Sequence, residues 1–182
     1  MINAKMDIRE EVLKEHSKRQ VLKIAAWIGT DEDRFRQFLF IFLNDEYRVV
    51  QRISWVLSVV ADEHPKLVEK NIGRIVKKLD EKDIHVAVKR NVIRVLQFLN
   101  IPVKHRAKVF DHCINYIADP NETVAVRCFA MTVASKITKQ YPELVGELEQ
   151  TITLLMKDST PGLRARAKMV LKDLGKLTPK TL

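Results

Sequence analysis

A repeat of about 38 residues runs along most of the chain, and it restricts the possible folds more than any other feature of the sequence. Arginines recur at intervals of 38, 37 and 39 residues: Arg52, Arg90, Arg127 and Arg166. Aspartates precede them by seven or eight residues: Asp45, Asp83, Asp119 and Asp158. Three prolines, 37 and 40 residues apart, each precede an amphipathic run: Pro65, Pro102 and Pro142. Each unit is therefore predicted to contain a helix, a short acidic turn, a second helix, and a loop that ends in proline.

The spacing of apolar residues inside each unit is that of a helix. After Pro65, Val68, Ile72 and Ile75 fall on one face, whereas Lys66 and Lys70 fall on the opposite face. With only 5 glycines and 6 prolines, the chain lacks the turn residues of a β-sandwich or barrel. Since a helix pair cannot bury both of its apolar stripes alone, the units are expected to stack.

The repeat predicts one all-α domain over residues 1–182, built from four to five two-helix repeats. The predicted repeats are 1–29, which is degenerate, 30–64, 65–101, 102–141 and 142–175, followed by a frayed tail over 176–182. Gly29 is expected to end a helix, and Thr30 or Asp31 to cap the next one. The run 55–61 is apolar almost all round, which predicts a helix covered on several sides.

These features resemble HEAT-like or armadillo-like helical repeats over residues 31–174. The resemblance implies a right-handed α-α superhelix, or solenoid, whose second helices line a concave surface that usually binds a protein. It specifies a fold and no activity. Short chains of this kind are sometimes labelled adenylosuccinate lyase, but the Ser-rich loop with a Met-Pro-x-Lys segment that marks such a lyase is missing from this sequence.

The recurring arginines have two interpretations. Each arginine could pair with a turn aspartate and tie the repeats together, or the series could form an anion-binding ladder on the concave surface. A shift of one residue in the repeat alignment turns an arginine about 100° around its helix, so both interpretations stay open. The candidate partner-binding residues are Arg52, Trp55, Arg90, Asn91, Arg94, Gln97, Arg127 and Arg166. Trp27 and Trp55 could also anchor a peptide or stack on a base, although their aliphatic neighbours favour core packing.

The sequence offers no recognisable catalytic, cofactor-binding or metal site, and no small-molecule substrate. In Asp111-His112-Cys113 the adjacent side chains point about 100° apart on a helix and cannot converge on one atom. Cys113 and Cys128 are expected to be reduced core residues. Some alkylpurine DNA glycosylases are built from similar repeats and use a helix-borne carboxylate, but the second helices predicted here have no Asp or Glu in their interiors.

A net charge of +9 favours anionic partners without specifying one. The longest apolar run, residues 38–43, is too short to cross a membrane, and the N-terminus lacks a secretory signal, so a cytoplasmic protein is expected. The sequence therefore predicts a non-catalytic binding or scaffolding module with a protein partner. The alternative is a nucleic-acid-binding protein that uses these arginines and the basic last helix, which carries Arg164, Lys168 and Lys172. An enzyme resembling a DNA glycosylase is a third, weaker alternative.

Overall fold

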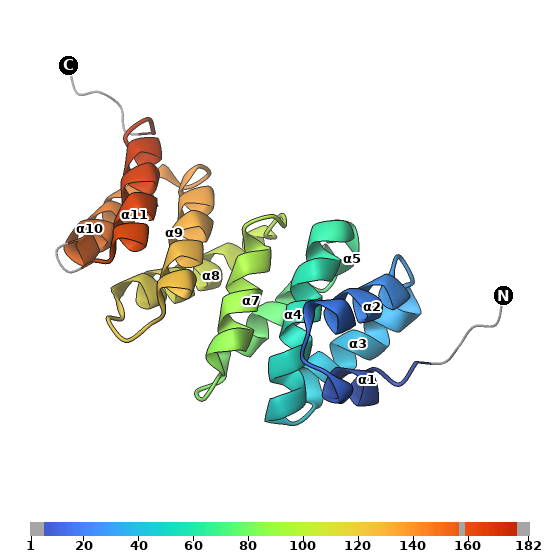
Figure 1. The fold of residues 1–182 in the computed structure, drawn as a ribbon. Helices are drawn as coiled ribbons and strands as arrows, with labels where there is room; N and C mark the ends of the chain where they lie inside the picture. Colours follow the sequence, from blue (N-terminus) through green and yellow to red (C-terminus); the bar gives the residue numbers. More distant parts are fainter. Residues whose placement is uncertain (1–5, 157–158, 178–182) are drawn as a thin grey trace, which may run out of the picture. The chain divides into compact units, whose positions relative to one another are not determined.

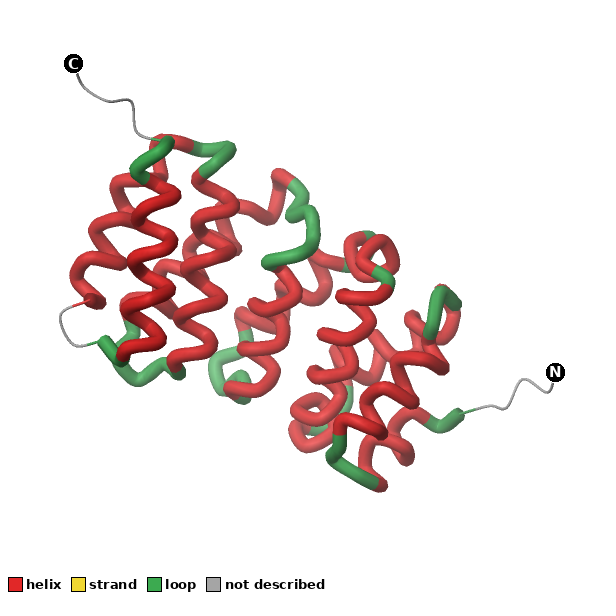
Figure 2. Tube along the Cα trace, turned by 45° about the horizontal axis from the view of Figure 1, so that its top comes forward, coloured by secondary structure: helices red, strands yellow, loops and turns green. Residues whose placement is uncertain are grey.

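The structure is a computed structural model of the 182-residue chain, and it describes residues 6–156 and 159–177. All regular secondary structure in these residues is helical (Figure 2), which confirms the predicted all-α fold. The chain divides into two compact units, residues 1–100 (unit 1) and 101–182 (unit 2). This division lies next to the predicted boundary between the third and fourth repeats. That the whole chain is one domain stays a prediction.

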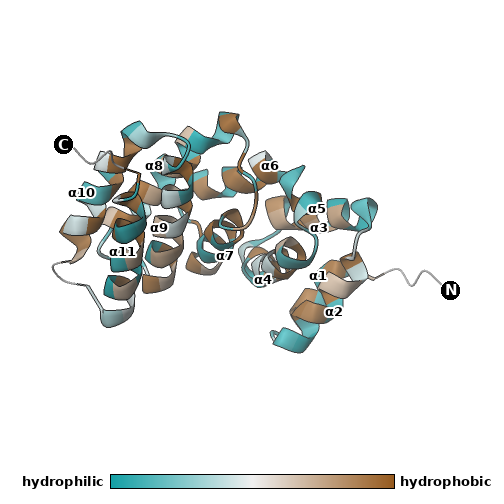
Figure 3. Ribbon diagram, turned by 90° about the horizontal axis from the view of Figure 1, so that it is seen from above, coloured by the Kyte–Doolittle hydropathy of each residue, from teal (hydrophilic) through white to brown (hydrophobic). Residues whose placement is uncertain are grey.

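The helices follow the predicted two-helix pattern in both units (Figure 1). Unit 1 contains α1 (Ile8–Lys14), α2 (Lys18–Ile28), α3 (Glu32–Asn44), α4 (Tyr47–Glu63), α5 (Pro65–Glu69), α6 (Ile72–Val76), the 3-10 helix η1 (Lys77–Asp80) and α7 (Val86–Leu96). Unit 2 contains α8 (Val103–Ala118), α9 (Val124–Thr138), the 3-10 helix η2 (Pro142–Leu144), α10 (Val145–Leu155) and α11 (Pro161–Leu174). Hydrophilic and hydrophobic residues alternate along the helices of both units (Figure 3).

Helix α4 is the centre of unit 1. It contacts α1, α2, α3, α5 and α7, and it buries Val56, Leu57 and Val60 completely. The prediction of a helix covered on several sides is therefore confirmed. In unit 2, α9 has the corresponding place, since it contacts α8, α10 and α11.

A ladder of three phenylalanine rings forms the core between α3 and α4. Phe35, Phe38 and Phe42 follow one another at helical spacing on α3 and are buried. The ring centroids of Phe35 and Phe38 lie 5.7 Å apart, and those of Phe38 and Phe42 lie 6.5 Å apart. Because rings of this size remove a large apolar area from water, the ladder is expected to contribute much of the stability of unit 1.

Local signals set most of the helix ends. Gly29 ends α2 with a φ of 49°, a conformation that favours glycine. Of the two predicted caps, Asp31 is the one that caps α3, because its carboxylate accepts hydrogen bonds from two N–H groups of the first turn. Pro65 opens α5 as predicted. Pro102 instead lies one residue before α8, and Pro142 opens the 3-10 helix η2 rather than α10.

The long helix predicted after Pro65 is interrupted. It divides into α5, α6 and η1, with the break at Asn71, whose φ and ψ are −115° and 9°. The Asn71 amide donates to the carbonyl oxygen of Leu67 at 3.4 Å, and Asn side chains that bond nearby backbone groups compete with helix formation. Gly73, two residues later, further weakens the helix.

Helix α1 lies against α2 and α4, where the sequence had left the first helix of the degenerate repeat undefined. It buries Ile8 and Val12. Arg9 on its exposed side forms ion pairs with Asp45 at 3.2 Å and Glu46 at 2.7 Å, in the turn that precedes α4. Helix α1 thus covers part of α4 by apolar packing and by charge.

Glu11 joins α1 to α2. Its carboxylate pairs with Lys14 on α1 and with Lys23 on α2, the latter at 2.6 Å, and accepts a hydrogen bond from the Gln20 amide at 2.8 Å. The hydrogen bonds from Lys14, Lys23 and Gln20 lower the pKa of Glu11 from 4.5 to about 2. The ionised carboxylate therefore stabilises the packing of α1 on α2.

In the Glu11→Gln variant, the amides of α1 are expected to exchange hydrogen faster at neutral pH than they do in the wild type. Because the pKa of Glu11 is lower in the folded state, its stabilisation is present above pH 4.5 and is lost as the pH falls toward about 2. The difference in exchange between the two proteins should shrink over this range. A difference that is the same at pH 2 and at pH 7 would contradict the role given to Glu11.

Candidate interaction surface

The four recurring arginines do not occupy equivalent positions. The third residue of each second helix is buried (Val49, Val88, Val126 and Leu163), so the helix starts can be superimposed. Counted from these starts, Arg52 and Arg166 are sixth residues, Arg90 is a fifth and Arg127 is a fourth. Since each step turns a side chain about 100°, the arginines form no continuous stripe.

Two of these arginines donate hydrogen bonds to backbone carbonyl oxygens at the C-terminal ends of other helices. Arg52 donates to the carbonyl oxygen of Leu13 at 3.0 Å and to that of Val12 at 3.3 Å, in the last turn of α1. Arg127 donates twice to the carbonyl oxygen of Ile117 in the last turn of α8, at 2.9 and 3.1 Å. Carbonyls in a last helical turn lack partners within their own helix, so these arginines cap helix ends.

The predicted pairing of these arginines with the turn aspartates is not observed in the described residues. Asp45 pairs with Arg9 instead of Arg52. The charges of Asp119 and Glu122 oppose the lowering of the pKa of Arg127 by burial. Of the other turn aspartates, Asp158 lies outside the described residues.

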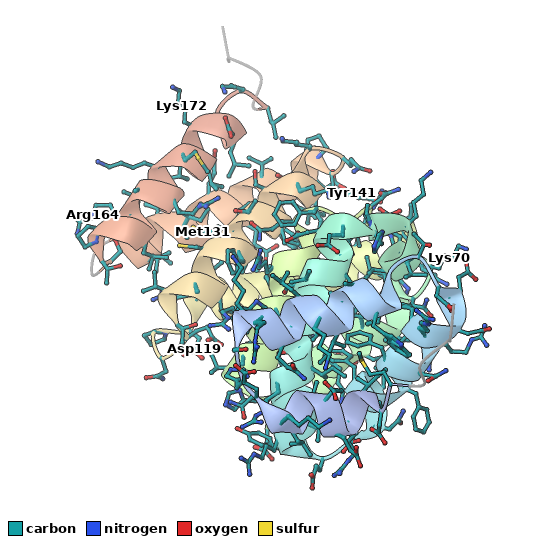
Figure 4. All side chains as sticks on the ribbon, turned by 45° about the vertical axis from the view of Figure 1, so that its right-hand side comes forward. Lys70, Asp119, Met131, Tyr141, Arg164 and Lys172 are labelled. Carbon is teal, nitrogen blue, oxygen red and sulfur yellow. The ribbon has the colours of Figure 1, made fainter. Side chains whose placement is uncertain are left out.

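The candidate residues in unit 2 serve contacts within the fold. Arg166 donates from Nη1 to the hydroxyl of Thr132 at 3.0 Å and so links α11 to α9. Arg164, which shares the helix position of Arg127, donates to the carbonyl oxygen of Ser159 at 2.9 Å. Figure 4 labels Arg164 and Lys172 on α11. Arg127 and Arg166 therefore hold helices of unit 2 together, whereas Lys168 and Lys172 are exposed on α11, and their binding of a nucleic acid stays a prediction.

Asn91, which the sequence offered as a partner contact, is buried between α4 and α7 with 3% of its surface exposed. Its Oδ1 accepts a hydrogen bond from the Ser58 hydroxyl at 2.9 Å. Its Nδ2 donates to the Ser54 hydroxyl at 3.0 Å and to the carbonyl oxygen of Ala87 at 2.8 Å. This prediction is wrong because the amide already uses its bonding groups to join the two helices.

The remaining candidates of unit 1 lie on one surface, which we call the α4–α7 face. It consists of Trp55 and Val59 on α4 together with Arg90, Arg94 and Phe98, on α7 and the turn that follows it. Helical spacing places the members of each helix on one side, and Arg94 reaches across the two helices to Asp62 at 3.2 Å. Gln97 lies beside this face, where its amide donates to the carbonyl oxygen of Arg94.

The two tryptophans are only partly buried, so the expectation of core packing holds in part. Trp55 is half-buried and meets the ring of His16 edge-on, with the centroids 5.9 Å apart. Trp27 is half-buried beneath the guanidinium of Arg34, which lies 4.8 Å from the ring centroid. Trp55 therefore presents part of an aromatic ring at the surface.

Arg90 is exposed and makes no hydrogen bond or ion pair with any residue that the structure describes. Arg94, one turn further along α7, is 38% exposed and shares its charge with Asp62, which is 43% exposed. The α4–α7 face therefore has a positive net charge.

Phe98 is a member of this surface that the sequence analysis missed. Its side chain is 60% exposed, although Val95, Leu96 and Leu99 around it are buried. Helical spacing alone does not identify it, because Phe98 follows the buried residues Asn91 and Val95 by seven and three positions and lies in the turn after α7. Phe98 extends the exposed apolar surface of the α4–α7 face beyond the end of α7.

The chemistry of the described residues offers no reactive centre. Burial raises the pKa of the thiols of Cys113 and Cys128, so both are protonated at neutral pH. Cys113 is buried as predicted, whereas Cys128 is half-buried. Within residues 6–156 and 159–177, no three His, Cys, Asp or Glu side chains are arranged to hold a metal ion. No helix there has the length and apolar character needed to span a membrane.

Comparison with known proteins gives one match. The family model of the HEAT repeat domain matches residues 8–174 of the chain. The match begins at the first residue of α1 and ends at the last residue of α11, so it includes the degenerate first repeat. No curated protein and no solved structure matches the chain.

Proposed function

Because this chain belongs to the HEAT repeat family, we propose that it is a non-catalytic scaffold that binds a protein partner through the α4–α7 face of unit 1. HEAT repeat domains are helical scaffolds that typically mediate protein interactions. The observation that carries the proposal is the exposure of Arg90 and Phe98, on α7 and the turn after it, together with the partly exposed ring of Trp55 on the adjoining helix α4. Arginine and tryptophan are enriched among the residues that dominate binding energy at protein interfaces.

The rigidity of the supporting helices favours this use of the surface. Arg90 and Arg94 flank Asn91 in sequence, and the buried hydrogen bonds of Asn91 hold α7 against α4. A partner would therefore meet side chains whose backbone is already ordered, which lowers the entropy lost on binding. The protonated thiols of Cys113 and Cys128 supply no activated nucleophile, in keeping with a non-catalytic role.

Quantitative affinity capture tests the proposal. The wild-type protein, the Arg90→Glu/Arg94→Glu variant and the Arg74→Glu/Lys77→Glu variant would be used as bait at near-physiological salt. The second variant is the matched control, since it makes the same charge change at exposed positions on α6 and η1.

We expect the wild type and the control to recover the same protein in stoichiometric amount, and the Arg90→Glu/Arg94→Glu variant to lose it. Charge reversal repels a complementary partner and leaves its charges unpaired. Recovery that is equal for all three baits, or recovery of no protein by any of them, would refute the proposed function of this face.

A further inference from the structure

We infer that the partner presents an acidic amphipathic helix to the α4–α7 face, an inference that rests on the proposed function. The carboxylates of this helix would pair with Arg90 and Arg94, and an apolar side chain would contact Phe98 and Trp55. Two observations support the inference: the charges of the face and the contacts that α4 makes with α1.

The charges of the face favour a negative partner. Arg90 has no partner among the described residues, and Arg94 shares its charge with the partly exposed carboxylate of Asp62. The two arginines are one helical turn apart on α7, or about 6 Å along the axis. Carboxylates at the i and i+4 positions of a second helix have the same spacing and could meet both guanidinium groups.

The apolar part of the face adjoins these charges. Phe98 lies one further turn along from Arg94, with 60% of its surface exposed, and Trp55 and Val59 contribute partly exposed apolar surface from α4. A helix with acidic residues followed by a large apolar residue on the same side therefore matches the order of groups along α7. Helices that dock in grooves place their contact residues at such intervals, which are positions i, then i+3 or i+4, then i+7 or i+8.

Helix α1 shows how α4 binds a short helix. It buries the aliphatic residues Ile8 and Val12, and its last carbonyls accept hydrogen bonds from Arg52. On the α4–α7 face the arginines lie on α7 and the apolar residues Trp55 and Val59 lie on α4. This face therefore offers arginine and apolar groups of the kind with which α4 contacts α1, so a short helix is the occupant that it fits.

A nucleic acid fits the face less well. A phosphate backbone is bound by several cations along its path, whereas the α4–α7 face has two arginines, one of which already pairs with Asp62. The exposed rings could stack on bases, which makes single-stranded DNA the appropriate competing probe.

Fluorescence anisotropy with a synthetic probe tests the inference. The probe is a labelled peptide of about 14 residues, roughly four helical turns, with Glu and Leu on one face and Ala elsewhere. A peptide with Lys in place of Glu and a single-stranded DNA of the same net charge are the comparison probes. The full chain would be titrated at near-physiological salt.

We expect the acidic peptide to bind, and the Arg90→Glu/Arg94→Glu variant to bind it at least about tenfold more weakly. Phe98→Ala should also weaken binding, whereas Arg74→Glu/Lys77→Glu should change it by less than about twofold. Arg90→Glu alone, which breaks no hydrogen bond or ion pair within the described residues, should weaken binding without affecting folding. Tryptophan fluorescence checks the folding of each variant, since both tryptophans lie in unit 1.

Four results would overturn the inference: no binding of the acidic peptide, equal loss in both charge-reversal variants, equal binding of the Lys peptide, or tighter binding of the DNA to the same arginines. The capture experiment separates this failure from that of the proposed function. If Arg90→Glu/Arg94→Glu still loses a captured protein while the acidic peptide does not bind, the binding surface is supported and the chemistry assigned to the partner is wrong.

Discussion

Phe38→Ala is expected to lower the free energy of unfolding of unit 1 by about 3–5 kcal/mol. Phe38 is the middle ring of the ladder on α3, is fully buried, and stacks on both Phe35 and Phe42. Its removal would leave a cavity that these two rings can close only partly, because each is fixed at its own helical position. Urea unfolding followed by tryptophan fluorescence measures the effect, since both tryptophans lie in unit 1.

Phe40→Ala is the matched control for Phe38→Ala. Phe40 lies on the same helix but is 63% exposed, so its replacement should change stability by less than about 0.5 kcal/mol. The control also separates the loss of a buried ring from any change in the helix propensity of α3, which both substitutions alter equally. Equal effects of the two substitutions would contradict the position of the core between α3 and α4.

Asn91→Ala should lower the free energy of unfolding of unit 1 by about 2–3 kcal/mol. The substitution removes three hydrogen bonds. Two join α7 to the hydroxyls of Ser58 and Ser54 on α4, and one is to the carbonyl oxygen of Ala87 within α7. The substitution leaves the hydroxyl of Ser58 without its bonding partner in a site that is 1% exposed. A buried polar group that loses its partner costs more than the hydrogen bond itself contributed, which makes this effect large for one amide.

A double-mutant cycle of Asn91→Ala with Ser58→Ala tests the origin of that loss. If the lost hydrogen bond causes it, the two changes together should cost less than the sum of the single changes, by about 0.5–3 kcal/mol. Arg90→Ala, one residue away on the exposed side of α7, should leave stability within about 0.5 kcal/mol. Additive effects of the two changes, or a large effect of Arg90→Ala, would contradict these separate roles of Asn91 and Arg90.

Features that depend on local sequence could be predicted closely. The last helix was expected within the repeat 142–175, and the structure has it there as α11, from Pro161 to Leu174. Its start is fixed by a proline and a capping threonine, and its apolar residues follow the helical period. The covered helix α4 was also predictable, because a run that is apolar on all sides is stable only when other helices surround it.

The candidate surface was predicted less well because it depends on packing between helices. Asn91 was grouped with its exposed neighbours Arg90 and Arg94, although helical spacing places it with Val88 and Val95 on the buried side. The position of each arginine around its helix depends on the residue at which that helix begins. A repeat of varying length does not fix this residue. The position of α1 against α4 depends on contacts distant in the sequence, such as Arg52 with Leu13, and no local pattern encodes them.

Site-specific photo-crosslinking in the native cell is the most direct test of the central claim, that the α4–α7 face binds a protein. Benzoylphenylalanine would replace Phe98 in one variant and Phe40 in another. These residues are 60% and 63% exposed phenylalanines of the same unit, but only Phe98 belongs to the face. We predict one specific protein adduct from position 98 and none from position 40. An adduct from position 40 with none from position 98 would contradict the account.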